Sequence, residues 1–325
     1  MDTNVLQTLR YKLQKRLKRI NAADFQIFHS IVVQTFGFLS ENPVVRGILD
    51  LERRAPSAEK ESEQLFQGTL LAGDNELQHI ALCYALLKRT VASGEDKEIE
   101  LGHTFGNCSK HKEAAECFID LFIEPLFDYI DEQIDDRRTT LGLLLKYKHR
   151  VEWFRRDELR ARFEAATQKG EKTLALDLYA CLHDQGLDFS IEPSSISGEA
   201  DLISAQEGPD RLVADVKIFD PGKSKGTSYL CAGFNQVYQY TKDYNDPFGY
   251  LVVFKSCRED LSVHARDQDV AIPFFTHNNK TIFVLVIDIF DYPQTASKRG
   301  HLKSYELLEE ELIRTISEST PAAPF

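Results

Sequence analysis

Residues 198–219 read GEADLISAQEGPDRLVADVKIF, and this stretch decides how the second half of the chain is expected to fold. Residues 199–205 and 212–219 are short and apolar, which is typical of β-strands. The polar stretch 206–211 between them contains Gly, Pro and Asp, the residues that punctuate strands. The sequence therefore predicts two short strands that are joined by a turn.

Charged side chains recur on one side of the second predicted strand. Because side chains alternate between the two faces of a strand, Asp215 and Lys217 share a face, and the other face carries Ala214, Val216 and Ile218. If the two strands pair as a hairpin, Asp201 can lie beside Asp215. Two carboxylates that close repel each other unless a cation lies between them, and Mg²⁺ prefers oxygen ligands. The alternative is that Asp215 and Lys217 are the solvent-facing side of an ordinary amphipathic strand.

The composition is that of an ordinary globular protein. The chain has 325 residues, of which 42% are hydrophobic and 28% are charged. Its longest apolar run, residues 282–287, has the length of a strand, and the N-terminus lacks the apolar core of a signal peptide. The six cysteines follow no disulfide framework. We therefore expect a cytoplasmic protein with reduced thiols and no membrane partner.

The net charge of −12 argues against a generic nucleic-acid coat protein. Residues 1–150 carry 20 Lys and Arg against 23 Asp and Glu, and residues 151–325 carry 19 against 28. The half that contains Asp215 is thus the more acidic one. Any contact with nucleic acid must therefore come from local basic patches, from a bound metal or from another subunit.

The hydrophobic periodicity changes near residue 168. Residues 1–168 are expected to be helical nearly throughout, apart from a break at Asn42-Pro43 and a polar loop at 55–63. Beyond them the pattern predicts a helix at 171–185, strands at 187–192, 199–205 and 212–219, a helix at 234–244, strands at 249–255 and 281–290, and a helix at 306–316. The fold class is therefore a helical domain followed by an α/β domain.

Two histidines and two cysteines lie close together in the helical half, namely His103, Cys108, His111 and Cys117. These side chains can bind zinc, but their spacing matches none of the common structural sites. The run Ala114, Cys117, Phe118 and Leu121 also has helical spacing. A zinc site and an ordinary helix with core cysteines and surface histidines both stay open at this level.

Three short motifs follow one another in the second half of the chain, namely Gly198-Glu199-Ala200-Asp201, Asp215-Val216-Lys217 and Gln236-x3-Tyr240. With the order helix, three strands, helix, strand, they resemble the core of the PD-(D/E)xK phosphodiesterase superfamily, including the QxxxY motif of its exonuclease-type branch. The resemblance covers about residues 170–255. It implies a restriction-endonuclease-like αβββαβ core with a mixed sheet in residues 169–325, after a helical recognition or regulatory domain in residues 1–168.

The resemblance also implies a metal-dependent hydrolytic site. The expected ligands of Mg²⁺ or Mn²⁺ are Asp201, Asp215, the carbonyl of Val216 and, from the first core helix, Glu171. Lys217 would position or activate the attacking water, because a cation stabilises charge that builds at phosphorus. Gln236 and Tyr240 would orient the site or the substrate, since they lie one helical turn apart. The alternatives are core packing for Tyr240, a surface position for Gln236 and helix capping for Glu171.

A basic, glycine-rich loop follows the Asp215 strand. Lys223 and Lys225 could reach a phosphate backbone, and Tyr229 could stack on a base. A surface loop without such a role is the alternative.

The function that these residues predict is Mg²⁺-dependent hydrolysis of phosphodiester bonds in DNA, with an endonuclease favoured over an exonuclease. Genome maintenance and antiviral defence against phage are the settings that the resemblance suggests, and a homo-oligomer or an activating protein is a further candidate partner. The alternative is a non-catalytic adaptor that keeps the nuclease fold and binds nucleic acid or protein. The intact set of two acids and a lysine favours the enzyme.

Overall fold

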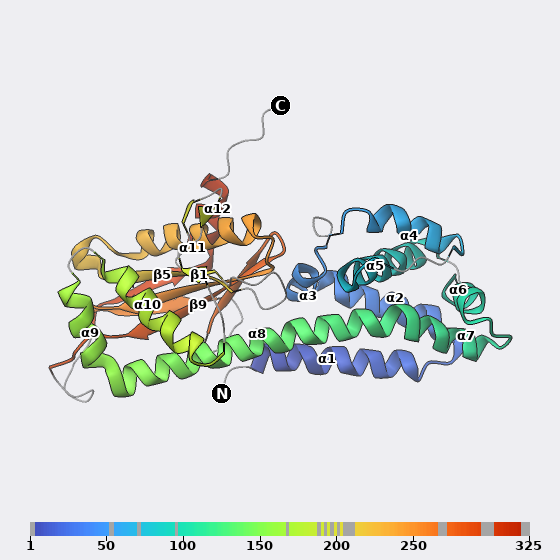
Figure 1. Ribbon diagram of the computed structural model, residues 1–325, viewed down its shortest axis with the longest axis horizontal. Helices are drawn as coiled ribbons and strands as arrows, with labels where there is room; N and C mark the ends of the chain where they lie inside the picture. The colour runs from blue at the N-terminus through green and yellow to red at the C-terminus, as the bar shows by residue number, and fades with distance from the viewer. Residues whose placement is uncertain are drawn as a thin grey trace, which may run out of the picture. The chain divides into compact units, whose positions relative to one another are not determined.

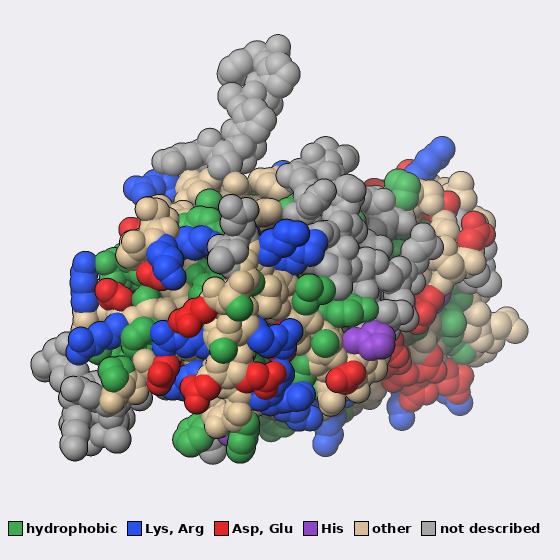
Figure 2. Space-filling model, turned by 60° about the vertical axis from the view of Figure 1, so that its left-hand side comes forward, with side chains coloured by type: hydrophobic (Ala, Val, Ile, Leu, Met, Phe, Trp, Pro, Cys, Tyr) green, Lys and Arg blue, Asp and Glu red, His purple; other side chains and the backbone are tan. Residues whose placement is uncertain are grey.

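The computed structural model of the chain describes residues 4–51, 55–69, 73–94, 97–166, 169–186, 190–191, 194–195, 198–199, 202–203, 212–265, 272–293 and 302–319. The chain packs into two compact units, residues 4–138 and residues 139–325. The first is helical and the second is mixed α/β (Figure 1). This division by packing lies before residue 168, where the sequence pattern changes. Although the net charge is −12, Lys and Arg side chains are spread among Asp and Glu over the face shown in Figure 2.

The described residues of the first unit form α-helices and one π-helical turn. They are α1 (Asn4–Asn21), α2 (Phe25–Glu41), α3 (Pro43–Ile48), α4 (Ala58–Phe66), α5 (Glu76–Ser93), α6 (Lys97–Gly106), α7 (His111–Phe118), η1 (Ile119–Ile123) and the first part of α8 (Glu124–Arg150). The predicted break at Asn42-Pro43 is confirmed. The Asn42 side chain accepts hydrogen bonds from the amides of Val44 and Val45, both at 3.1 Å, and so caps α3.

The polar loop expected at 55–63 is wrong, because helix α4 begins at Ala58. This short helix buries Ala58, Ser62 and Leu65 along one side, and the Ser62 hydroxyl donates to the carbonyl of Glu59 at 2.7 Å. Three small or apolar positions among many charged ones are a weak sequence signal, yet they are enough once a neighbouring helix covers them.

The second unit contains the end of α8 and all the strands. Its helices are η2 (Val151–Arg155), α9 (Arg156–Ala165), α10 (Gly170–His183), η3 (Pro221–Lys223), α11 (Thr227–Asp243) and α12 (Glu309–Ser319), of which η2 is a π-helix and η3 a 3₁₀-helix. Its strands are β1 (Ser190–Ile191), β2 (Ser194–Ser195), β3 (Gly198–Glu199), β4 (Leu202–Ile203), β5 (Val213–Phe219), β6 (Phe248–Lys255), β7 (Asp260–His264), β8 (Phe274–His277), β9 (Lys280–Asp288) and β10 (Ser304–Leu308).

A mixed sheet in the order β1-β4-β5-β6-β9-β8 forms the centre of the second unit. Strands β5, β6 and β9 are parallel, and the other pairs in this sheet are antiparallel. Helix α11 lies along one face and α10 across the other (Figure 1). Every residue of β6 is therefore buried, as expected for a parallel strand that helices cover on both sides.

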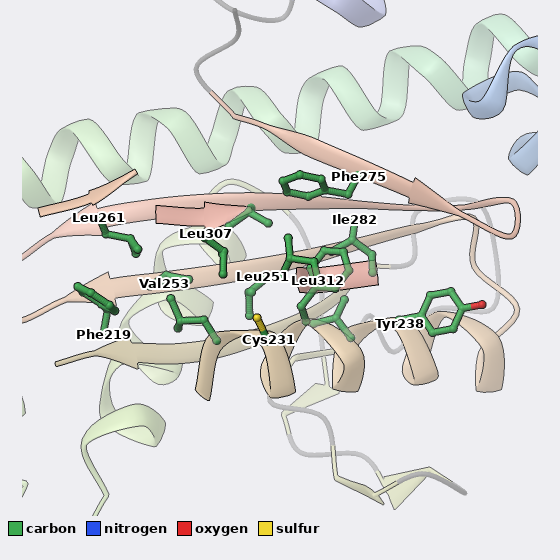
Figure 3. Packing of buried hydrophobic residues seen from close by; sticks show 14 of the residues in the cluster. Phe219, Cys231, Tyr238, Leu251, Val253, Leu261, Phe275, Ile282, Leu307 and Leu312 are labelled. Atoms are coloured by element: carbon green, nitrogen blue, oxygen red, sulfur yellow. The ribbon is translucent and has the colours of Figure 1, made fainter. Parts of the chain in front are cut away.

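The apolar core on the α11 side joins segments from the whole unit (Figure 3). It includes Phe219 of β5, Leu251 and Val253 of β6, Cys231 and Tyr238 of α11, Leu307 of β10 and Leu312 of α12. Strand β10 pairs in parallel with β7, which brings α12 against α11. The C-terminal helix is thus part of the support under the central strands.

The pairing predicted for the first two strands is confirmed where the structure describes it. Strand β4 is antiparallel to β5, with Leu202 opposite Ala214 and Ile203 opposite Val213. Several boundaries differ from the expectation. The C-terminal helix α12 begins at Glu309 and not at residue 306, because residues 304–308 form strand β10. Residues 198–199 belong to a separate strand, β3, which pairs with β2 inside the loop expected at 193–198. Helix α11 begins at Thr227 and not at residue 234, so Tyr229 is helical.

Candidate active site

Strand β5 brings Asp215 and Lys217 together on the face that α11 covers. Asp215 is 1% exposed, and its Oδ2 lies 2.7 Å from Nζ of Lys217, whose side chain is 11% exposed. On the same face of β5, Val213 packs against Tyr240 of α11. The predicted shared face is therefore confirmed, but it faces a helix and not open solvent. A buried carboxylate held against a buried ammonium is an unusual use of two charged residues, because burial penalises each of them.

Gly233 of α11 makes room for the stem of Lys217. A β-carbon at this position would lie 2.8 Å from Cγ of Lys217, which is closer than real β-carbons come to other atoms, and 3.0 Å from its Cε, which is a tight contact. The lysine stem therefore runs directly over bare helix backbone. Sequence reasoning missed Gly233, because the helix was predicted to begin at residue 234 and α11 begins at Thr227.

Glu171, in the first turn of α10, ties three elements together. Its Oε1 accepts hydrogen bonds from Nζ of Lys225 at 2.8 Å, from the hydroxyl of Tyr229 at 2.7 Å and from the amide of Ile218 at 3.1 Å. Burial opposes the charge on Glu171, but these donors outweigh it and lower the pKa of this carboxyl below its ordinary value. Glu171 was expected as a metal ligand, and the structure shows this oxygen engaged with protein donors.

The lowered pKa of Glu171 gives a testable pH dependence. A carboxyl whose pKa is lower in the folded state than in the unfolded state stabilises the fold. This contribution is complete at pH values above the pKa of the unfolded state, 4.5, and it is lost as the pH falls through the pKa of the folded state. We therefore expect Glu171→Gln to lower the melting temperature at pH 7, and this difference from wild type to shrink below pH 4.5. Thermal unfolding between pH 7 and pH 3 measures it. A difference that stays constant over this range would contradict the assignment, and Glu164→Gln, on the exposed side of α9, is the control.

Gln236 and Tyr240 are in contact on α11, as their spacing predicts. The Nε2 of Gln236 donates to the hydroxyl of Tyr240, whose ring is fully buried against Val213. Val213 precedes Asp215 by two residues on the same face of β5, so this pair supports the strand next to the Asp215–Lys217 ion pair. The core-packing alternative for Tyr240 is thus compatible with a supporting role in the site.

The three residues expected to contact nucleic acid lie in two environments. Lys223 is 68% exposed and pairs with Asp220 at 3.3 Å. Lys225 turns inward to Glu171, and its Nζ lies 5.2 Å from the centre of the Tyr229 ring. The Nζ of Lys217 lies 6.0 Å from the same ring. Tyr229 is therefore flanked by two ammonium groups, and Lys223 is the residue whose side chain extends into solvent.

The first acidic motif is only partly described, whereas Val216 is described in full. Asp201 lies outside the residues that the structure describes, and so does the side chain of Glu199, its neighbour in the motif. Val216 is buried in β5 opposite Val252 of β6. Within the described residues, no group of three or more His, Cys, Asp or Glu side chains is arranged to hold a metal ion. Asp215 is a ligand of the right chemistry for Mg²⁺, but a complete site requires a further acid.

No family model, curated protein or solved structure matches this chain. As for membranes, none of the helices in the described part combines the length and the apolar character needed to cross a bilayer.

In the group of His and Cys residues in the helical unit, the two histidine side chains contact each other. Nε2 of His103 lies 3.0 Å from Nδ1 of His111, and Nδ1 of His103 lies 2.8 Å from the carbonyl of Cys108. Since the carbonyl only accepts, His103 donates from Nδ1. The two histidines line a pocket of about 590 Å³ with Phe25, Gln26, Ile99 and Glu100. The zinc alternative gains no support, because these four side chains, all of them described, form no metal-holding group.

Proposed function

We propose that the second unit is a metal-dependent nuclease that hydrolyses phosphodiester bonds in DNA, and that it uses a PD-(D/E)xK-type core. The buried Asp215–Lys217 ion pair on β5 carries this proposal. Replacing a buried ion pair by hydrophobic residues of similar volume often costs no stability, so the fold alone does not explain why these two charges are buried here. The order α10, β1, β4, β5, α11, β6, with antiparallel pairing on one side of β5 and parallel pairing on the other, also supports it.

The register of β4 supports Asp201 as the second acid. Leu202 pairs with Ala214 in the antiparallel ladder, and Asp201 and Asp215 are the next residues along each chain. Asp201 itself lies outside the described residues, and we propose on this register that it supplies the second carboxylate beside Asp215. Directly opposite residues in an antiparallel pair have their β-carbons about 4.5–5.5 Å apart, which lets two carboxylates share one ion.

Each residue then has a chemical task. Asp201 and Asp215 would hold Mg²⁺ with the carbonyl of Val216, and a bound divalent ion polarises a phosphoryl oxygen and lowers the pKa of water. Lys217, whose stem has room beside Gly233, would set the position of the attacking water and stabilise the negative charge that builds on the phosphoryl oxygens. Glu171 would hold Lys225 and Tyr229 beside this site, through its three hydrogen bonds.

The test is a cleavage assay on the purified chain with circular DNA, linear duplex DNA, single-stranded DNA and RNA, each with Mg²⁺, with Mn²⁺ and with chelator. We expect metal-dependent cutting of DNA that is lost in Asp201→Asn. Cutting of the circular substrate would identify an endonuclease. Equal cutting by wild type and Asp201→Asn would refute the site, and equal inertness of both on every substrate would favour the non-catalytic adaptor.

Gly233 allows the position of Lys217 to be tested apart from its charge. We expect Gly233→Ala to lower the rate of cleavage about 10- to 100-fold, because a misplacement of about 1 Å in a site can cost that much. The free energy of unfolding should change much less than the rate, since Ala is the better helix former by about 0.5–1 kcal/mol. Gly142→Ala on α8, where a β-carbon meets nothing within 4 Å, is the matched control. Full activity in Gly233→Ala would contradict the role assigned to Lys217.

A further inference from the structure

An exposed aromatic pair lies where α8 passes into the π-helical turn η2. Trp153 and Phe154 are 75% and 77% exposed, the two highest values among the exposed large hydrophobic side chains of the described residues. Trp153 is also the only tryptophan in the sequence. Large aromatic rings left in water at adjacent positions indicate a binding surface rather than a packing role.

The π-helical turn brings both rings next to one imidazole. The ring centres of His149 and Trp153 are 5.8 Å apart with an angle of 20° between their planes, so they are stacked. His149 and Phe154 have ring centres 5.7 Å apart. Five residues make about 1.4 turns of an α-helix, so the second contact would be lost in regular helix. The wider π-helix η2, which begins two residues after His149, carries both Trp153 and Phe154. We call His149, Trp153 and Phe154 the aromatic ledge.

Basic side chains continue the aromatic ledge along α8. Lys146, His149, Arg150 and Trp153 have the spacing of one helix face, and all four side chains are exposed. The guanidinium of Arg150 lies 3.6 Å from Sγ of Cys181. Residues 146–162 carry seven Lys and Arg against three Asp and Glu, in a chain whose net charge is −12. Figure 2 turns the α9 end of the molecule forward, and Lys and Arg recur across that face.

The surroundings of the aromatic ledge are polar. Helix α9 follows directly, and of its ten residues, all of which are described, Leu159 is the buried one. Its other positions are mostly charged, and its Arg160 and Arg162 pair with Glu158, Glu164 and Asp177. A membrane-binding helix or a protein interface needs a broader apolar face than two rings provide. Flat rings beside cations are the combination that binds unpaired bases together with their phosphates.

We propose that the aromatic ledge binds single-stranded nucleic acid, with a base stacked on Trp153 or Phe154 and phosphates bound by Lys146 and Arg150. This inference rests on the proposed nuclease function, because the bound strand would be an unpaired segment of the DNA substrate. Stacking requires only the flat face of a base, so the surface would accept many sequences. The His149 ring extends the platform through its stacked position.

The single tryptophan makes the test direct. The full chain carrying Asp215→Asn, with chelator present so that nothing is cut, is titrated with oligothymidylate while tryptophan fluorescence is recorded. We expect saturable quenching that reports contact at Trp153 itself. In parallel, Trp153→Ala is titrated into a labelled oligothymidylate, and we expect binding to weaken about 5- to 150-fold. Replacing both Lys146 and Arg150 by Gln should reduce the slope of log K against log salt by about 0.7 per cation.

Tyr11→Ala is the matched control, since Tyr11 is a 54% exposed ring with the Nζ of Lys15 4.5 Å from its centre. Its affinity should equal that of the parent. The inference would be overturned if Trp153→Ala and Tyr11→Ala weakened oligothymidylate binding equally. It would also be overturned if oligothymidylate did not quench the fluorescence at low salt, or if anionic vesicles quenched it in place of the oligonucleotide. If wild type cuts DNA and the fluorescence of Trp153 does not change, the binding role of the aromatic ledge is refuted and the proposed nuclease function is not. If oligothymidylate quenches Trp153 and wild type cuts no substrate, the proposed nuclease function is refuted and the binding role of the aromatic ledge is not.

Discussion

Asp215→Asn is expected to reduce metal-dependent DNA cleavage about a thousandfold. The substitution keeps the shape of the side chain and removes the negative charge that would hold the metal. Charge stabilisation of this kind is worth several kcal/mol, and each 1.4 kcal/mol corresponds to about a factor of ten in rate. The measurement is the single-turnover rate at saturating Mg²⁺. Asp260→Asn, at the exposed start of β7, should cleave at the wild-type rate.

Stability separates this chemical loss from simple damage to the fold. Asp215→Asn leaves the buried ammonium of Lys217 without its anion, which typically costs about 3–5 kcal/mol. In the double variant Asp215→Asn/Lys217→Met both charges are gone, so the free energy of unfolding should recover most of this loss. Activity should stay absent in the double variant. Recovery of cleavage together with stability would show that the pair serves the fold alone, and the site would be wrong.

Asp177→Ala is expected to lower the free energy of unfolding of the second unit by about 2–3 kcal/mol. The Asp177 carboxylate on α10 is 5% exposed and accepts from the hydroxyl of Tyr147 at 3.0 Å, from Arg155 at 3.1 and 3.3 Å and from Arg162 at 2.8 Å. It therefore ties α8, η2 and α9 to α10. The value is below that for a fully buried pair, because the two arginine side chains are partly exposed.

Chemical denaturation, followed by a signal from the second unit such as Trp153 fluorescence, measures this effect. Asp184→Ala at the exposed end of α10 should change the free energy of unfolding by less than about 0.5 kcal/mol. Tyr147→Phe removes one of the donors and should cost about 1 kcal/mol. A loss in Asp177→Ala no greater than in Asp184→Ala would contradict the role of this carboxylate. Burial first, and then Asp177, raise the pKa of Tyr147 well above its ordinary value, so its hydroxyl is a donor throughout this experiment.

Local patterns in the sequence determined most of the elements. The alternation in β5 placed Asp215 and Lys217 on one face, and the apolar run at 249–255 predicted the buried strand β6. Asn42-Pro43 marked the start of α3. These features follow from periods of 2.0 and 3.6 residues and from the backbone limits of proline, all of which act within a few residues. A pair of elements, such as β4 and β5, could likewise be predicted because they are close neighbours in the sequence.

Tertiary structure decided which side chains meet. Glu171 contacts Lys225 and Tyr229, which are 54 and 58 residues away, and Gly233 lies against the stem of Lys217. No local pattern distinguishes the inward Lys225 from the exposed Lys223, or a polar loop from helix α4. Their positions depend on contacts with distant elements, which form only when the whole unit packs and whose gain must exceed the entropy of ordering them. The sequence supplied the candidate groups, and packing decided which of the described ones lie next to each other.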